Sequence, residues 1–189
     1  MKAYLRLVFL LTVICLVCTA LLAAVHTLTR EPIEQARLAR EQAAIRKVLP
    51  PGVTNFSAIA VGGITNVVAL DGAGQLAAAA IKGHSDKGYG GGIELLVGFE
   101  ADGRLHNFEV LQAAETPGLG ARIASDDFKA GIRRRPAGTR WAVRKDGGEI
   151  DAITAATISS RAALEAIRDA SAQFQTLRET LQKGAQATP

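Results

Sequence analysis

Residues 93–111, IELLVGFEADGRLHNFEVL, carry the clearest fold signal in the chain. Two apolar-rich runs, 93–99 and 104–111, flank Asp102-Gly103, and Asp-Gly between such runs is a strong signal for a β-hairpin. Two more runs, 67–70 and 76–81, flank the turn sequence DGAG at 71–74. The segment 141–144 predicts a further short strand before Asp146-Gly147-Gly148. We therefore expect antiparallel strands in the middle of the chain.

The residues after 160 change from a strand pattern to a helical one. Apolar side chains recur there at helical spacing, at Leu164, Ile167, Phe174, Leu177 and Leu181. The last residues, 183–189, read as a flexible tail. Strands followed by a long helix predict an α+β domain over residues 53–182.

The N-terminal segment has the composition of a membrane span. No charged residue lies between Arg6 and Arg30, and 7–25 is almost wholly apolar. A bilayer core needs about 20 helical residues, whereas the apolar core of a cleaved signal peptide is usually about 7–15 residues long. Because the run is longer and 20–25 (ALLAAV) offers no clear cleavage site, we expect a retained transmembrane helix at 7–28. Lys2 and Arg6 favour a cytoplasmic N-terminus at 1–6 and an exported domain.

An amphipathic stalk helix is expected between the span and the domain, over 29–52. Thr29 is a suitable capping residue, Pro32 suits a first helical turn, and Pro50-Pro51-Gly52 ends the pattern. Both cysteines, Cys15 and Cys18, fall inside the span, so the exported part has no disulfide and no Cys-ligated metal site. We interpret them as small apolar residues of one helix face, the alternative being half of a redox site.

The distribution of charge removes the main compositional support for a nucleic-acid partner, and we expect none. The formal net charge is +4, and Lys2, Arg6 and Arg30 contribute three of these charges without an acid among residues 1–30. The rest of the chain is nearly neutral, apart from a basic segment at 122–145. A solvated surface is the first interpretation of that segment, and docking to lipid headgroups or to an acidic partner is the alternative.

Three segments combine glycines and hydroxyls in an unhelical order: KGYGGGI at 87–93, ETPGLG at 115–120 and DAITAATISS at 151–160. Each has an ordinary structural explanation, namely a tight start of a strand, a turn and a helix cap. The third would also suit a phosphate, because free N–H groups and the positive end of the dipole meet at a helix N-terminus.

Together these segments resemble the RnfG family, the FMN-binding subunits of the Rnf (Rsx) ion-translocating electron transport complexes. They are more distantly similar to the NqrC family of the sodium-pumping NADH:quinone reductases. The shared motifs are G-Y-x-G-x-I at 88–93, L-V-G at 96–98, E-T-P-G-L-G at 115–120 and D-A-[IV]-[ST]-G-A-T at 151–157. With the N-terminal span and the stalk, the resemblance covers nearly the whole chain.

The resemblance implies one FMN per chain, esterified through its phosphate to the hydroxyl of Thr157 by a flavin transferase that uses FAD and magnesium. Thr154 would support the phosphate and Leu119 would contact the flavin, while Glu115 and Thr116 would hold their loop by hydrogen bonds. The implied cofactor-binding residues are Tyr89, Glu115, Thr116, Gly118, Leu119, Gly120, Thr154, Ala155, Ala156 and Thr157.

Two residues depart from the family pattern. The usual glycine of [ST]-G-A-T is Ala155 here, and Ala113 stands where many members have a histidine. If position 155 needs a positive φ, alanine adds backbone strain there or blocks the transferase.

The function implied is that of an electron-carrying subunit, with no catalytic residue of its own, in a multi-subunit ion-translocating complex of the bacterial inner membrane. Its domain would lie in the periplasm, and its partners would be the other subunits and the lipid bilayer. No G-x-G-x-x-G motif lies between a strand and a helix, which argues against an NADH site. The alternatives are a flavin-free structural subunit and a stand-alone, membrane-tethered flavoprotein reductase.

Overall fold

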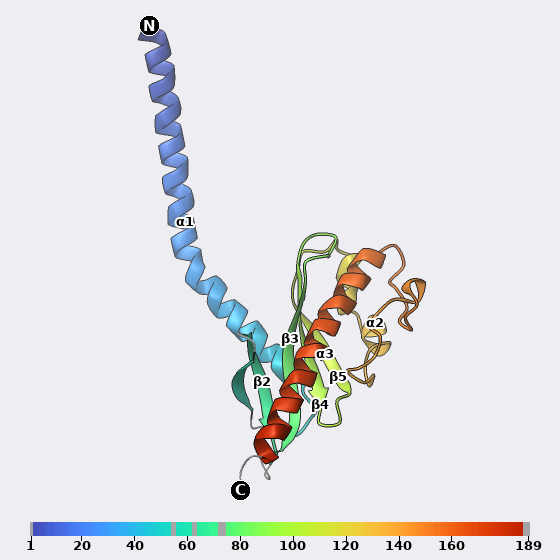
Figure 1. Ribbon diagram of the computed structural model, residues 1–189. Helices are drawn as coiled ribbons and strands as arrows, with labels where there is room; N and C mark the ends of the chain where they lie inside the picture. Colours follow the sequence, from blue (N-terminus) through green and yellow to red (C-terminus); the bar gives the residue numbers. More distant parts are fainter. Residues whose placement is uncertain (1, 54–55, 62–63, 72–74, 187–189) are drawn as a thin grey trace. The chain divides into compact units, whose positions relative to one another are not determined.

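The computed structural model describes residues 2–53, 56–61, 64–71 and 75–186 (Figure 1). Helix α1 precedes a run of strands, and α3 closes the chain. The elements are α1 Lys2–Val48, β1 Ser57–Val61, β2 Ile64–Leu70, β3 Leu76–Ser85, β4 Ile93–Glu100, β5 Leu105–Ala113, η1 Gly120–Ala124, α2 Asp126–Ala130, η2 Arg144–Asp146 and α3 Thr157–Gln186. The α+β fold class is confirmed.

The strands of the described chain form one antiparallel sheet in the order β1-β2-β3-β4-β5. The expected β4–β5 hairpin is confirmed: Ile93 pairs with Ala113 at its open end, and Gly103 takes a φ of 87° in its turn. The β2–β3 pair is confirmed as well, although residues 72–74 of its connection lie outside the described part. The edge strand β1 was not expected, because its short sequence SAIAV carries little strand signal.

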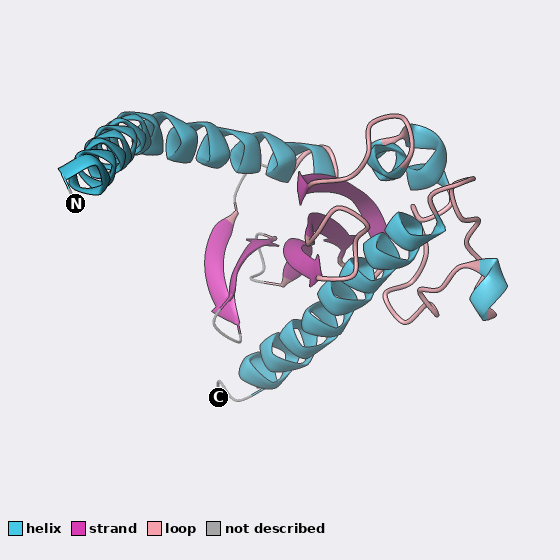
Figure 2. Ribbon diagram, turned by 90° about the horizontal axis from the view of Figure 1, so that it is seen from above, coloured by secondary structure: helices cyan, strands magenta, loops and turns pink. Residues whose placement is uncertain are grey.

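Both faces of the central strands are buried. Alternate residues of β4, including Leu95, Val97 and Phe99, face α3, and the rings of Phe99 and Phe174 stack at 4.5 Å. On the other face, Leu96 and Ala80 pack against the last turn of α1, with Ile45 and Val48. Figure 2 shows the sheet between these two helical elements. The end of α1 is therefore part of the core of the domain.

Two glycines let helix backbones come close to the sheet. A Cβ added at Gly98 would lie 1.9 Å from the carbonyl oxygen of Val48, and one at Gly83 would lie 2.0 Å from that of Ala166. Any larger residue would push α1 or α3 away from the sheet. This explains the glycine of the L-V-G motif as a packing requirement.

Helix α1 is continuous, whereas the sequence suggested a new helix at Thr29–Pro32. The Thr29 hydroxyl donates to the carbonyl of Val25 instead of capping a helix, and Pro32 lies inside α1. Proline removes one backbone donor, but the helix-favouring residues on both sides keep the helix intact. The chain divides into two compact units, 1–41 and 42–189, and α1 crosses that division. Its apolar part makes it, by length and composition, a candidate membrane span.

The expectation of a strand at 141–144 was wrong. Val143 makes a single isolated bridge to Ile150, and η2 follows directly. Trp141 is buried, and its indole N–H donates to the carbonyl of Ala137, so core packing decides this segment rather than a strand ladder. Both boundaries of α3 also differ, because it begins at Thr157 and continues through 183–186. The short helix α2, capped by Ser125, was not expected.

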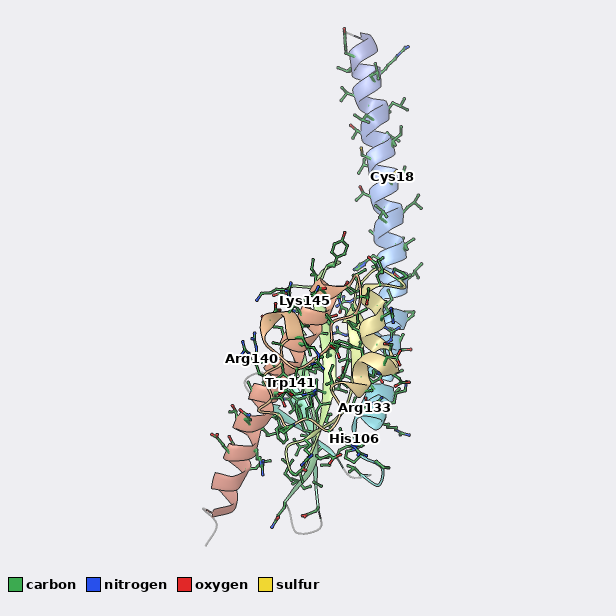
Figure 3. All side chains as sticks on the ribbon, turned by 90° about the vertical axis from the view of Figure 1, so that its right-hand side faces the viewer. Cys18, His106, Arg133, Arg140, Trp141 and Lys145 are labelled. Carbon is green, nitrogen blue, oxygen red and sulfur yellow. The ribbon has the colours of Figure 1, made fainter. Side chains whose placement is uncertain are left out.

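Four of the eight lysine and arginine side chains in the basic segment 122–145 form ion pairs with acidic residues of the domain. Ion pairs join Lys129 to Glu109, Arg133 to Asp126, Arg135 to Glu149 and Arg144 to Asp151. Figure 3 shows Arg133 away from Arg140 and Lys145, and Arg140 Nη2 donates to the backbone carbonyl of Asp146 at 3.2 Å. These observations favour the solvated-surface interpretation of this segment.

Glu165 joins α3 to the end of β3 and to the loop between β3 and β4. Lys87 Nζ donates to its Oε1 at 2.8 Å, and Ser85 Oγ donates to its Oε2 at 2.9 Å. These bonds, that of Lys87 first, hold the pKa of Glu165 below its ordinary value of 4.5. The stabilisation that these bonds give to the folded state is complete above pH 4.5, and it is lost as the pH falls through the lowered pKa.

We expect Glu165→Gln to lower the free energy of unfolding by about 1 kcal/mol at pH 7 and to make no difference in acid below the lowered pKa. Urea unfolding at several pH values measures this. The control is Glu149→Gln, whose carboxylate is 75% exposed in its pair with Arg135 and should change little. A loss from Glu165→Gln that does not depend on pH would contradict the assignment.

Candidate functional site

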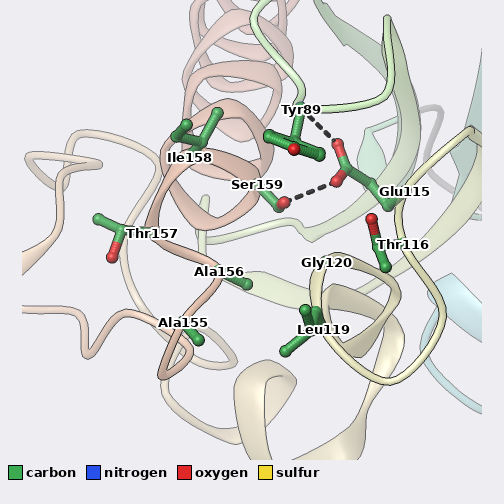
Figure 4. A pocket seen from close by; sticks show the side chains of 10 residues that line it. All are labelled: Tyr89, Glu115, Thr116, Leu119, Gly120, Ala155, Ala156, Thr157, Ile158 and Ser159. Atoms are coloured by element: carbon green, nitrogen blue, oxygen red, sulfur yellow. Dashed lines mark hydrogen bonds between the residues drawn. The ribbon is translucent and has the colours of Figure 1, made fainter.

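A pocket of about 520 Å³ opens where the three glycine- and hydroxyl-containing segments meet. Figure 4 shows Glu115 and Thr116 on one side, and Ala155, Ala156 and Thr157 on the other. The lining residues are Tyr89, Glu115, Thr116, Leu119, Gly120, Ala155, Ala156, Thr157, Ile158 and Ser159. Eight of the ten residues expected from the sequence are thus brought together, and Gly118 and Thr154 are not among the lining residues.

The pocket contains the N-terminus of α3. Ser160 N–H donates to the carbonyl of Ala156 at 3.0 Å, so Ala156 is the capping position and Thr157 the first residue of the helix. Ala156 has no side-chain acceptor for the N–H groups of the first turn, which by helix geometry lack partners inside the helix. Thr157 therefore offers a hydroxyl beside free donors and the positive end of the helix dipole, a suitable place for a phosphate.

Ser160 fixes the approach to this helix. Its Oγ donates to the carbonyl of Ala156 at 2.9 Å and accepts from Ile153 N–H at 3.0 Å. The side chain is fully buried. Its hydroxyl therefore connects Ile153 to Ala156 across the segment that leads into α3.

Ala155 adopts the left-handed conformation, with a φ of 62°. An L-residue with a Cβ pays about 1–2 kcal/mol for this conformation, whereas glycine adopts it freely. The glycine of the family pattern is thus explained by the backbone, and the alanine of this chain is strained.

We expect Ala155→Gly to raise the free energy of unfolding by about 0.5–1 kcal/mol, because relief of the strain exceeds the extra entropy of glycine in the unfolded chain. Urea unfolding of the two proteins measures the difference. Ala152→Gly is the matched control, since Ala152 has no positive φ and should lose stability. A loss of stability in Ala155→Gly would show that the left-handed conformation is not strained in this context.

Glu115 connects all three segments of the pocket. Its side chain is buried, Oε1 accepts from Tyr89 N–H at 2.8 Å, and Oε2 accepts from Ser159 Oγ at 2.7 Å. Glu115 therefore bonds to the neighbouring segments, while its own turn is held by the backbone carbonyl of Thr116, which accepts from Leu119 N–H and Ala121 N–H at 3.2 Å.

Two glycines make room for this arrangement. A Cβ at Gly120 would lie 2.3 Å from Glu115 Oε2, and one at Gly90 would lie 1.7 Å from the carbonyl oxygen of Ala114. Side chains at these positions would force the segments apart. The glycines of both motifs are therefore required for close packing around the carboxylate.

The mouth of the pocket is apolar. Tyr89, Ile158 and Leu119 are 71%, 49% and 43% exposed, high fractions for large side chains in a folded domain. An apolar rim beside a helix N-terminus fits a ligand with a flat aromatic ring and a phosphate, such as FMN. Ile158 and Ser159 were missed from the sequence, although their positions in the first turn, directly after Thr157, could have indicated them.

Two family models match the chain. The model described as FMN-binding domain matches residues 88–172, and the one described as RnfG N-terminal region matches residues 1–48. The first includes every residue that lines the pocket, and the second coincides with α1.

Two curated relatives match over most of their length. The G-type subunit of the ion-translocating oxidoreductase complex of Pseudomonas aeruginosa is 34% identical, over 95% of this chain and 92% of that protein. Its counterpart in Cronobacter sakazakii is 33% identical, over 86% of each chain. The crystal structure of Shewanella oneidensis NqrC superposes with a TM-score of 0.48 at 20% identity, over 63% of this chain and 61% of that chain. The chain therefore belongs to the RnfG family, the G-type subunits of the ion-translocating oxidoreductase complexes.

Proposed function

We propose that this protein carries FMN in ester linkage to Thr157 and transfers electrons as a subunit of a membrane-bound ion-translocating oxidoreductase complex. The observation that carries the proposal is the position of Thr157, which is the first residue of α3 and one of the residues that line an apolar-rimmed pocket. Membership of the RnfG family and the match to an FMN-binding domain support it.

The linkage needs a hydroxyl and little else from this chain. The oxygen of Thr157 forms a bond to the FMN phosphorus of FAD, the pyrophosphate bond breaks, and AMP leaves. The hydroxyl proton passes to a base of the flavin transferase, which also brings the magnesium ion. Thr157 is thus the acceptor of the transferred FMN group and not a catalyst. The free N–H groups of the first turn stabilise the negative charge that remains on the phosphodiester.

The remaining side chains of the pocket hold the ring system and exclude water. Leu119, Ile158 and Tyr89 offer the apolar surface for this, and Ser159 with Glu115 forms the polar part of the wall. A bound flavin exchanges one or two electrons with neighbouring centres, and the dipoles and charges around it set its potential.

The apolar part of α1 anchors the domain to the membrane. We propose a single span in the bacterial inner membrane, with Lys2 and Arg6 on the cytoplasmic side and the flavin domain in the periplasm. The other members of the complex are the partners in electron transfer, and electron transfer is coupled to ion transport in the assembled complex.

The test is to look for flavin on the denatured protein. The full-length chain, purified in detergent from cells that contain a flavin transferase, should fluoresce in a denaturing gel. Its intact mass should exceed that of the bare chain by one FMN less one water. A band without fluorescence and an intact mass equal to that of the bare chain would instead favour the flavin-free structural role. A fluorescent protein that never co-purifies with other subunits would favour the stand-alone reductase.

A further inference from the structure

We infer that Glu115 supplies a fixed negative charge inside the pocket and thereby lowers the reduction potential of the flavin proposed to occupy it. The inference rests on the proposed function and assigns a tuning role to a residue that does not take part in attachment. It follows from the burial, the charge and the hydrogen bonds of one side chain (Figure 4).

Glu115 is the one Asp, Glu, Lys or Arg residue among the described residues that line the pocket. It is 9% exposed, so water screens its charge weakly. No lysine or arginine lines the pocket beside it, and its described hydrogen-bond donors, Tyr89 N–H and Ser159 Oγ, are both neutral. The negative charge is therefore solvated by dipoles and not cancelled by a counter-ion.

The position of the carboxylate is fixed on several sides. Besides its two hydrogen bonds, it is confined by Gly120 and Gly88, where an added Cβ would lie 2.3 Å from Oε2 and 2.7 Å from Oε1. Because the carboxylate cannot rotate out of the pocket, its negative charge acts on the bound flavin in both the oxidised and the reduced state. Reduction adds negative charge to a flavin, so a fixed negative charge close by makes reduction less favourable.

Glu115→Gln tests the charge separately from the geometry. Glutamine has the same shape, can accept from Tyr89 N–H through its oxygen, and can donate to Ser159 Oγ through its amide. In the flavinylated full-length protein, we expect this change to shift the midpoint potential to a more positive value. Because the charge is buried, the shift should persist at high salt.

The matched control is Asp102→Asn in the β4–β5 turn. It also removes one negative charge, but at the opposite end of β4, roughly 25 Å away along an eight-residue strand. We expect no shift there. If Glu115→Gln shifts the potential no more than Asp102→Asn does, or shifts it to a more negative value, the inference is wrong and Glu115 is a structural residue only.

Ser159→Ala keeps the inference testable if Glu115→Gln accepts no flavin. Measured at alkaline pH, the change removes one neutral dipole that partly compensates the carboxylate, so the potential should shift to a more negative value. An unchanged or more positive potential would overturn the inference. Failure of the proposed function is detected by a different measurement, the fluorescence of the wild-type chain in a denaturing gel. Without that fluorescence there is no covalent flavin whose potential could be measured, and the inference fails together with the proposed function.

Discussion

Replacing Thr157 with alanine is expected to abolish covalent flavin completely, with no fluorescence in a denaturing gel and the intact mass of the bare chain. Only a hydroxyl can form the phosphoester, and Thr157 is the hydroxyl residue at the first position of α3. The change removes a half-buried side chain at a helix end and should cost little stability. A loss of this kind is all or none, unlike the partial effects expected elsewhere in the pocket.

Thr176→Ala is the matched control, because Thr176 is an exposed threonine of the same helix and is not among the lining residues of the pocket. It should keep most of its fluorescence. Thr157→Ser restores the hydroxyl and should restore attachment. A Thr157→Ala protein that still fluoresces after denaturation would assign the linkage to another residue.

Gly98→Ala should lower the free energy of unfolding by about 3 kcal/mol, the largest stability effect that we expect from a change of one methyl group. The added Cβ would lie 1.9 Å from the carbonyl oxygen of Val48 and 3.0 Å from its Cβ. Backbone atoms cannot rotate away as the end of a long side chain can, so α1 or β4 must move. Urea unfolding of the full-length protein in detergent measures the loss.

Gly138→Ala is the control for the glycine-to-alanine change itself. Its Cβ would meet only Gln175 Nε2, at an ordinary 3.7 Å, and Gly138 has no positive φ. We expect it to be neutral or slightly stabilising, because alanine reduces the entropy of the unfolded chain. Equal stabilities of Gly98→Ala and the wild type would mean that α1 does not pack on the sheet as described.

Local sequence signals predicted much of the fold. The hairpin of 93–111 depends on neighbouring residues and on a turn glycine, which are visible in sequence. The apolar run near the N-terminus and the helical spacing after 160 were equally local. The same reasoning failed at 141–144 and at Thr29–Pro32, where burial of Trp141 and the continuity of α1 overrode local patterns.

The candidate site was found from motifs, and the reasons for those motifs came from the structure. The sequence posed the question of a positive φ at position 155, and a φ of 62° at Ala155 answers it. It also suggested that Glu115 holds its own loop, whereas its bonds reach Tyr89 and Ser159. Ile158 and Ser159 were missed because the helix start was placed too late.

By itself, the sequence determined the order of the segments: an apolar helix, a hairpin-built sheet, three glycine- and hydroxyl-containing stretches and a final helix. Only the tertiary structure decided that these stretches form one pocket and that one carboxylate joins them. Glu115 lies 26 residues from Tyr89 and 44 from Ser159. Contacts over such separations depend on how the sheet and α3 pack together, and no local propensity encodes that packing.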